Sequence, residues 1–200
     1  MKEKDLAGII RYVLGNREPG AIEDEEGLYR HASVLIPLFS HNGEYRVLLT
    51  KRTTRVEEHK GQISFPGGSV DRDDQSYEET ALREAQEEIG LKREDVTILG
   101  RTDDTLTLAS NFIIHPFVGV LPYPYPFRVN SFEVKRILEV PFDFFLERTL
   151  KYHTGQIEEK GQVYEGPVYH YQGDVIWGAT AKILENLVNI LKTDLLERGN

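Results

Sequence analysis

The sequence predicts an α+β fold in which strands are interspersed with three helices in packed layers. Two observations predict this class: apolar residues recur at helical spacing in three segments, and between them lie short apolar runs bounded by glycine, proline and asparagine. The chain has 200 residues, of which 40% are hydrophobic, so it can bury a sizeable core. It contains no repeat and no internal linker, and we therefore expect one domain over residues 1–200.

Composition excludes several classes of function. The 24 Lys and Arg residues against 33 Asp and Glu give a net charge of −9, which would repel a nucleic-acid backbone. The absence of cysteine excludes disulfide frameworks, thiolate zinc sites and cysteine nucleophiles, and it fits the cytoplasm. No apolar run approaches the ~18 to 20 residues of a membrane span. We expect a cytoplasmic protein that binds neither nucleic acid nor membranes, with a homodimer left open.

The first third of the chain predicts a helix, a hairpin and a functional loop. Residues 6–14 have helical apolar spacing and precede Gly15, so residues 1–30 are expected to form a helix and a connector. The apolar runs 32–39 and 45–51 flank an Asn42-Gly43 turn, which predicts two antiparallel strands. The polar, glycine-rich segment 52–74 is expected to be a long loop that carries function.

The remaining elements begin with a helix whose limits are clear. Ser76 and Glu79 form a capping box, a helical pattern covers residues 77–89, and Gly90 takes the terminating position. Strands are predicted at 96–99 and 112–121, in a short run to residue 140, near residue 163 and at 168–171. The proline-rich segment 122–127 is predicted to be a loop. A final helix over 176–196 would begin at Trp177, which is expected to anchor the core.

Three carboxylates lie on one flank of the central helix. Glu84, Glu87 and Glu88 are neighbours at helical spacing, where like charges destabilise a helix by a few tenths of a kcal/mol. Arg83 can pair with Glu87, but Glu84 has no cation three or four residues away. Clustered carboxylates without a cation suit Mg²⁺ or Mn²⁺. From spacing alone, a solvated acidic helix face is an equally good interpretation.

The glycine pair Gly67-Gly68 and the run from Arg83 to Leu91 together resemble the Nudix box of the Nudix hydrolase superfamily. The resemblance implies an α/β/α sandwich with a mixed, largely antiparallel sheet, and hydrolysis of pyrophosphates with Mg²⁺ or Mn²⁺. Glu84 and Glu88 would be the main metal ligands. Glu87 would be a third ligand or the general base, and Glu133 in a later loop could serve as the base instead.

One part of the box departs from the family pattern. Counting back from Arg83, the usual glycine falls on Ser69 and the usual first glutamate on Gln75, so the loop is one residue longer. Asp74 is the nearest acidic substitute. We therefore expect the Asp74 carboxylate to pair with Arg83. The resemblance places Arg83 among the catalytic residues.

A second motif concerns the substrate. Residues 48–53 and 59–68 resemble the extended signature of the coenzyme A pyrophosphatase branch, and similarity covers roughly residues 32–181. This implies hydrolysis of coenzyme A, or a derivative, to phosphopantetheine and adenosine 3′,5′-bisphosphate. The substrate-binding candidates are of three kinds. Four cations could reach the ribose phosphate: Lys51, Arg52, Arg55 and Lys60. His59 could order the loop or contact a phosphate, and the backbone at Gly67 and Gly68 could approach an anion.

Other interpretations remain open. The same cations could be solvated loop residues. The box specifies the reaction and not the substrate, so a Nudix pyrophosphatase acting on ADP-ribose, dinucleotides or nucleoside triphosphates is the nearest alternative. A catalytically silent nucleotide-sensing module is a second, although such a module has no need of all three glutamates.

Overall fold

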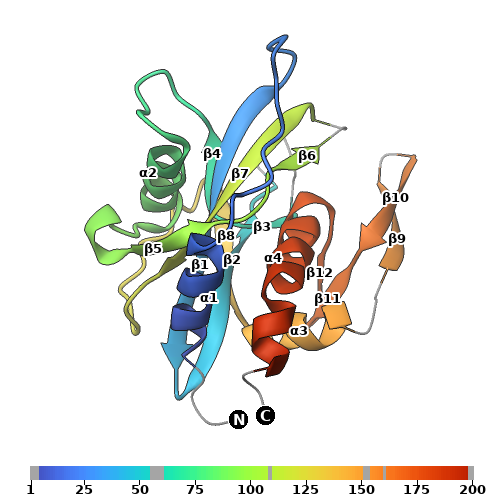
Figure 1. Ribbon diagram of the computed structural model, residues 1–200. Helices are drawn as coiled ribbons and strands as arrows, with labels where there is room; N and C mark the ends of the chain where they lie inside the picture. The colour runs from blue at the N-terminus through green and yellow to red at the C-terminus, as the bar shows by residue number, and fades with distance from the viewer. Residues whose placement is uncertain (1–4, 55–60, 108–109, 151–153, 160, 198–200) are drawn as a thin grey trace.

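The computed structural model describes residues 5–54, 61–107, 110–150, 154–159 and 161–197, and a mixed β-sheet lies at its centre (Figure 1). The eight strands of this sheet, in the described part of the chain, are β1 (Arg30–His41), β2 (Glu44–Arg52), β3 (Ile63–Ser64), β4 (Gly67–Ser69), β5 (Thr97–Arg101), β6 (Thr105–Thr107), β7 (Phe112–Val120) and β8 (Val134–Pro141). The main path of the sheet is β3-β2-β1-β7-β5, with β4 paired to β1, β6 to β7 and β8 to β2.

Strand direction confirms the predicted mixed sheet. β1 and β7 are parallel over nine residue pairs from Arg30↔Phe112 to Leu38↔Val120. The other strand pairs found among the described residues are antiparallel. The β1–β2 hairpin closes at Asn42 and Gly43, whose φ values of 54° and 76° are those that a two-residue hairpin turn requires.

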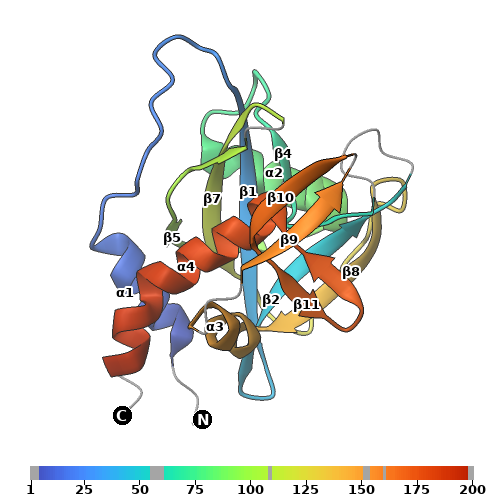
Figure 2. The same cartoon turned by 90° about the vertical axis from the view of Figure 1, so that its right-hand side faces the viewer.

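Helices cover both faces of the sheet, as the α/β/α expectation requires (Figures 1 and 2). Helix α2 (Tyr77–Ile89) packs on one face, and α1 (Leu6–Gly15), α3 (Phe142–Leu150) and α4 (Gly178–Glu197) pack on the other. Alternation along β1 divides the core between the faces: Leu35 and Phe39 lie under α2, whereas Ile36 and Leu38 join the cluster on the opposite side. No helix in the described ranges is both long and apolar enough to cross a membrane.

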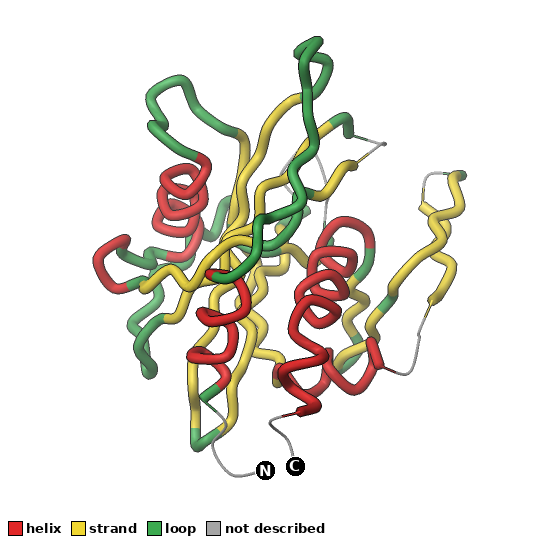
Figure 3. Tube along the Cα trace, viewed as in Figure 1, coloured by secondary structure: helices red, strands yellow, loops and turns green. Residues whose placement is uncertain are grey.

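Smaller elements complete the fold. The connector between α1 and β1 is a long loop (Figure 3), and it is fastened to the sheet where the backbone N–H of Ile22 donates to Asp104 Oδ2 at 3.0 Å. A 3₁₀ turn, η1, covers Arg93–Asp95. Two short hairpins precede α4: β9 (Thr154–Glu159) with β10 (Gln162–Pro167), and β11 (Tyr169–Tyr171) with β12 (Asp174–Ile176).

The structure corrects several predicted elements. Helix α3 was not predicted, because its apolar run of aromatic residues has no extended helical periodicity; burial of Phe142 and Phe145 in the core stabilises it. The predicted loop 52–74 contains β3 and β4, and β6 was also missed, because strands of two or three residues have no detectable alternation. Helix α4 begins at Gly178, two residues later than expected, since Ile176 ends β12.

Candidate active site

Helix α2 carries the candidate carboxylates, and its ends are capped as the sequence predicts. The Ser76 side chain accepts from the backbone N–H of Glu79 at 3.1 Å, and Gly90 ends the helix in the left-handed conformation at φ 69°. Ala81, Ala85 and other apolar residues of the helix are buried against the sheet. This packing fixes the rotation of α2, so that its glutamate flank faces the loop that contains β4.

The two glycines of that loop lie where a side chain cannot be accommodated. In β4, Gly67 pairs with Val34 and Gly68 pairs with Ser33 of β1. A Cβ at position 67 would stand 2.4 Å from the Ser33 carbonyl oxygen, and one at position 68 would stand 2.5 Å from the Glu84 carboxyl carbon. Glycine therefore allows the Glu84 carboxylate to lie directly against the loop backbone.

Arg83 joins the loop to the glutamates. Its Nε and Nη2 each donate to one Asp74 carboxylate oxygen at 2.9 Å, and Nη1 donates to Glu84 Oε1 at 2.8 Å. Nη2 also reaches the Ser69 carbonyl at 3.2 Å. The hydrogen bonds from Arg83 hold the pKa of the buried Asp74 carboxyl well below its usual range. The Asp74–Arg83 contact expected from the shifted box is thus present, in the bidentate geometry that orients a guanidinium.

Glu88 is the most deeply buried of the three helix glutamates, at 1% exposed. Its Oε1 accepts from Arg52 Nη1 at 3.3 Å, whereas its buried Oε2 has no well-formed hydrogen bond to any described residue. Burial raises the pKa of Glu88 to about 8; Arg52 and the Gly67 amide oppose this shift, and the nearby Glu84 charge adds to it. A buried carboxylate with an unpartnered oxygen is poised for a cation.

Glu84 and Glu87 differ from Glu88 in exposure. The Glu84 side chain is 17% exposed, and burial raises its pKa although Arg83 opposes the shift. The Glu87 side chain is 57% exposed and lies 3.4 Å from Arg83 Nη1. The flank of the helix that faces β4 therefore presents a buried, a partly buried and a solvated carboxylate.

A later loop contributes Glu133. Two backbone bonds fasten this loop to the C-terminal end of α2: Arg128 N–H donates to the Ile89 carbonyl at 2.9 Å and Asn130 N–H to the Glu88 carbonyl at 2.8 Å. Asn130 Nδ2 then donates to Glu133 Oε1 at 3.1 Å. The negative charge of Glu133 raises the pKa values of Glu84 and Glu88, so it belongs to the same electrostatic cluster. The sequence carried no local sign of Asn130 as the residue that orients Glu133.

The donor set fits a divalent cation. All four glutamates offer carboxylate oxygens, the ligands that Mg²⁺ and Mn²⁺ prefer, and Glu88 Oε2 has no well-formed hydrogen bond to a described residue to give up. In the described ranges no three acidic or histidine side chains are already arranged as a ligand set, and Arg83 and Arg52 contact Glu84 and Glu88 instead. The residues that could hold a metal are therefore Glu84 and Glu88, with Glu87 or Glu133 turning inward.

The predicted cations divide between two sides of β2. Arg52 points to Glu88, but the neighbouring Lys51 points to the other face, where its Nζ donates to Asp174 Oδ1 at 2.7 Å. Strand alternation requires this separation. Arg55, His59 and Lys60 lie outside the described residues.

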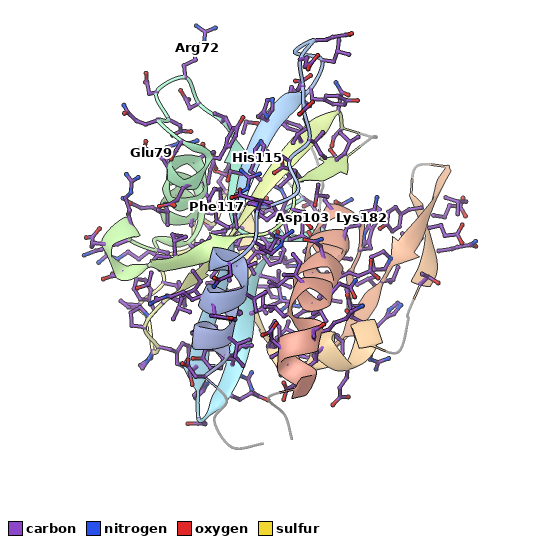
Figure 4. All side chains as sticks on the ribbon, in the orientation of Figure 1. Arg72, Glu79, Asp103, His115, Phe117 and Lys182 are labelled. Atoms are coloured by element: carbon purple, nitrogen blue, oxygen red, sulfur yellow. The ribbon has the colours of Figure 1, made fainter. Side chains whose placement is uncertain are left out.

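A second polar cluster lies near the N-terminal end of α2, and no local sequence pattern indicated it. His115 Nδ1 lies 2.8 Å from Asp104 Oδ1, its Nε2 lies 3.0 Å from His31 Nδ1, and the Tyr77 ring stacks on it at 3.6 Å between centroids. Figure 4 shows His115 in the centre of the molecule, with Phe117 below it in the same strand. These contacts fix the start of α2 against β1 and β7.

Comparison with known proteins identifies the family that this geometry belongs to. The NUDIX domain family matches residues 29–142, more than half of the chain. The protein belongs to the Nudix family. As a Nudix hydrolase it acts on pyrophosphate bonds.

Similar Nudix proteins cover most of the chain. Those called uncharacterized Nudix hydrolase NudL include one from Photorhabdus laumondii, 37% identical over 158 residues, which are 79% of this chain and 83% of the relative. Another, from Pectobacterium atrosepticum, is 39% identical over 158 residues, which are 79% and 81% of the two chains.

Solved structures agree on the Nudix fold. The MutT protein from Methanosarcina mazei Go1 superposes with a TM-score of 0.53 at 16% identity, covering 86% of this chain and 98% of that one. The NUDIX hydrolase from Alicyclobacillus acidocaldarius gives 0.51 at 18% identity, covering 80% and 91%. At these identities the likeness concerns the fold alone.

Proposed function

We propose that the protein hydrolyses the pyrophosphate bond of coenzyme A or a derivative, with Mg²⁺ or Mn²⁺, to give phosphopantetheine and adenosine 3′,5′-bisphosphate. One observation carries the proposal. The two segments that resemble the coenzyme A pyrophosphatase signature meet where β2 pairs with β3, at Thr50↔Ser64. The first segment brings Arg52 to Glu88, and the second brings Gly68 against Glu84. Both segments therefore border the carboxylates of the Nudix helix.

In this proposal Glu84 and Glu88 bind the metal ion. The support is the unpartnered Oε2 of Glu88 and the glycine backbone that leaves room for the Glu84 carboxylate. A bound divalent cation supplies charge neutralisation at the pyrophosphate and acidifies the attacking water. Arg83 acts through Glu84 and Glu87, so it is a positioning residue, and Asp74 fixes its plane. Arg52 is free to move from Glu88 to a phosphate oxygen once a cation neutralises that glutamate.

We propose Glu133 as the general base that takes the proton of the attacking water. Asn130 orients its Oε1, and the loop that carries it is fastened to the Glu88 carbonyl, so the carboxylate is held beside the cluster. Glu87 remains the alternative base or a third metal ligand. Its exposed side chain pairs only with Arg83 among the described residues, so it must turn inward for either role.

The substrate assignment is tested by a panel of coenzyme A, acyl-coenzyme A, NADH and ADP-ribose, each with Mg²⁺ and with Mn²⁺, with product identification. We expect coenzyme A or an acyl derivative to have the highest kcat/KM, and phosphopantetheine or its acyl form with adenosine 3′,5′-bisphosphate as products. Turnover of ADP-ribose well above that of coenzyme A would replace the substrate assignment and leave the metal chemistry intact. Binding of nucleotides without turnover would instead favour a nucleotide-sensing module.

A further inference from the structure

A cavity of about 370 Å³ opens on the side of β2 that faces away from Glu88. Its lining residues come from β2, β3, the β9–β10 hairpin, β12 and the residue that precedes α4. Its volume falls within the range of small-molecule sites, ~300 to 1,000 Å³. The side chains that line it include Lys51, Gln62, Ile63, Ile157, Val175 and Trp177.

Two charged groups of the cavity, Lys51 and Asp174, already form an ion pair. Asp174, which is 5% exposed, accepts from Lys51 Nζ at 2.7 Å and also from Arg136 Nη2. Glu158, on the rim, adds a negative charge. A phosphate would find Lys51 engaged and Glu158 repulsive, so the cavity disfavours an anion. Its apolar surface, from Ile157 and other residues, instead suits an uncharged ligand.

The wall of the cavity is close along the chain to the loop that lies against Glu84. Ile63 lines the cavity, and Gly67, four residues later, belongs to the loop against Glu84. Four residues span at most about 14 Å. The backbone N–H of Arg52 also donates to the Gln62 carbonyl at 3.0 Å. This bond joins β2, which carries Arg52, to Gln62 in the cavity wall.

We propose that this cavity holds the uncharged pantetheine arm of the substrate, an inference that rests on the proposed function. The arm is roughly 15 Å long when extended, by comparison with about four residues of extended peptide, which matches the reach of the chain between the loop at Glu84 and the cavity wall at Ile63. Its geminal methyl groups pack on Trp177 and Ile157. ADP-ribose has no such arm, and contact with it would therefore select coenzyme A-type substrates over other pyrophosphates.

Steady-state kinetics of Ile157→Ala test the proposal, with Val163→Ala as the matched control. Both residues lie in the β9–β10 hairpin, but Val163 is 65% exposed and does not line the cavity. We expect Ile157→Ala to raise the KM for coenzyme A about five- to twentyfold with kcat within twofold, because the lost apolar contact is equal in ground and transition states. Its kcat/KM for ADP-ribose, and all constants of Val163→Ala, should stay unchanged.

Fluorescence gives a readout that does not require turnover, because Trp177 is the only tryptophan of the chain. The probe is N-pentylpantothenamide, an uncharged pantetheine analogue without a quenching thiol. We expect it to shift the Trp177 emission of the intact protein saturably, with an affinity that Ile157→Ala weakens at least fivefold and Val163→Ala does not. Adenosine 3′,5′-bisphosphate should cause no comparable shift.

The two readouts separate this inference from the proposed function. If coenzyme A is hydrolysed, the kinetics decide: an unchanged KM in Ile157→Ala overturns the pantetheine assignment and leaves the coenzyme A pyrophosphatase assignment standing. If coenzyme A is not hydrolysed, the fluorescence decides. Saturable binding of the analogue then supports the cavity assignment while the proposed function falls, and the absence of binding overturns both.

Discussion

Glu88 and Asp174 are both buried carboxylates, on opposite sides of β2, and their surroundings differ in the number of cations. Asp174 accepts from Lys51 and Arg136, and although burial opposes them, these cations hold the pKa of Asp174 below its usual value. Among the described residues, Glu88 pairs with Arg52 alone, at 3.3 Å, and burial raises its pKa to about 8. A paired buried carboxylate joins segments of the fold, whereas an underpaired one is destabilising until a cation arrives.

The two cations that make this difference are adjacent in the sequence. Lys51 and Arg52 leave β2 in opposite directions, so one strand supplies a structural ion pair on one face and a longer contact to the candidate metal site on the other. Buried ionisable groups therefore cannot be ranked by burial alone. Their partners decide whether they stabilise the fold or serve a site.

The largest effect is expected from the metal ligands. Glu84→Gln and Glu88→Gln should each lower kcat at least about a thousandfold, because a bound metal contributes several kcal/mol of transition-state stabilisation. Asp174→Asn should lower kcat less than about threefold in the fraction that remains folded. Turnover at saturating Mg²⁺ and thermal melting measure the two quantities. Near wild-type turnover of Glu88→Gln would show that the underpaired carboxylate is not a ligand.

The general base is expected to have the next largest effect. Removing such a base costs roughly 10² to 10⁴ in rate. We expect Glu133→Gln to lose about a hundredfold or more in kcat at pH 7 and to recover part of it at higher pH, where hydroxide is abundant. Glu87→Gln should lose clearly less. The reverse order in the pH–rate profiles would assign the base to Glu87 and leave Glu133 as a neighbour of the cluster.

Stability should change in opposite directions for the two buried carboxylates. In the unfolded chain Glu88 ionises near pH 4.3, but in the folded chain near pH 8, so the folded state holds the extra proton between these values and loses stability as pH rises through this window. In metal-free buffer at pH 8, Glu88→Gln should therefore raise the free energy of unfolding by up to about 4.5 kcal/mol. Asp174→Asn should lower it by about 2 kcal/mol, since it leaves two cations without their partner.

Urea denaturation at pH 4.5 and pH 8 in the presence of EDTA measures both effects. The gain in Glu88→Gln should shrink to about 0.6 kcal/mol at the lower pH, where the wild-type carboxyl is protonated in the folded state and only about half ionised in the unfolded state. Added Mg²⁺ should stabilise the wild type at pH 8 and Glu88→Gln much less. A Glu88→Gln protein that is less stable than wild type at pH 8 without metal would contradict the description of Glu88 as underpaired.

Local patterns were sufficient to predict the parts of the site that lie close together in the sequence. The caps of α2, the β1–β2 turn and the Asp74–Arg83 contact each depend on residues less than about ten positions apart. The Lys51–Asp174 pair could not be predicted in this way, because its partners are separated by 123 positions and meet only after β12 folds against β2.

Two further features depended on tertiary packing. Helix α3 forms because Phe142 and Phe145 are buried in the core, which its own sequence pattern does not indicate. Trp177 was expected to anchor the core, but it is only half-buried and lines a cavity whose opposite wall, at Ile157, comes from a separate hairpin. The residues near Trp177 in the sequence indicate neither the cavity nor the hairpin that carries Ile157.

The smallest expected effect concerns the cations themselves. The protein should prefer coenzyme A to dephospho-coenzyme A by roughly tenfold or more in kcat/KM, because one charge-assisted hydrogen bond to the ribose phosphate contributes ~1.5 to 3 kcal/mol. Arg52→Gln should reduce this preference by slowing coenzyme A, since its weak contact to Glu88 leaves it available to the substrate. Lys51→Gln should lower the melting temperature and leave the preference within twofold, since Asp174 holds Lys51 on the other face of β2. Equal loss of preference in both variants would mean that Lys51 leaves Asp174 during binding. An unchanged preference in Arg52→Gln would move the phosphate contact to another cation.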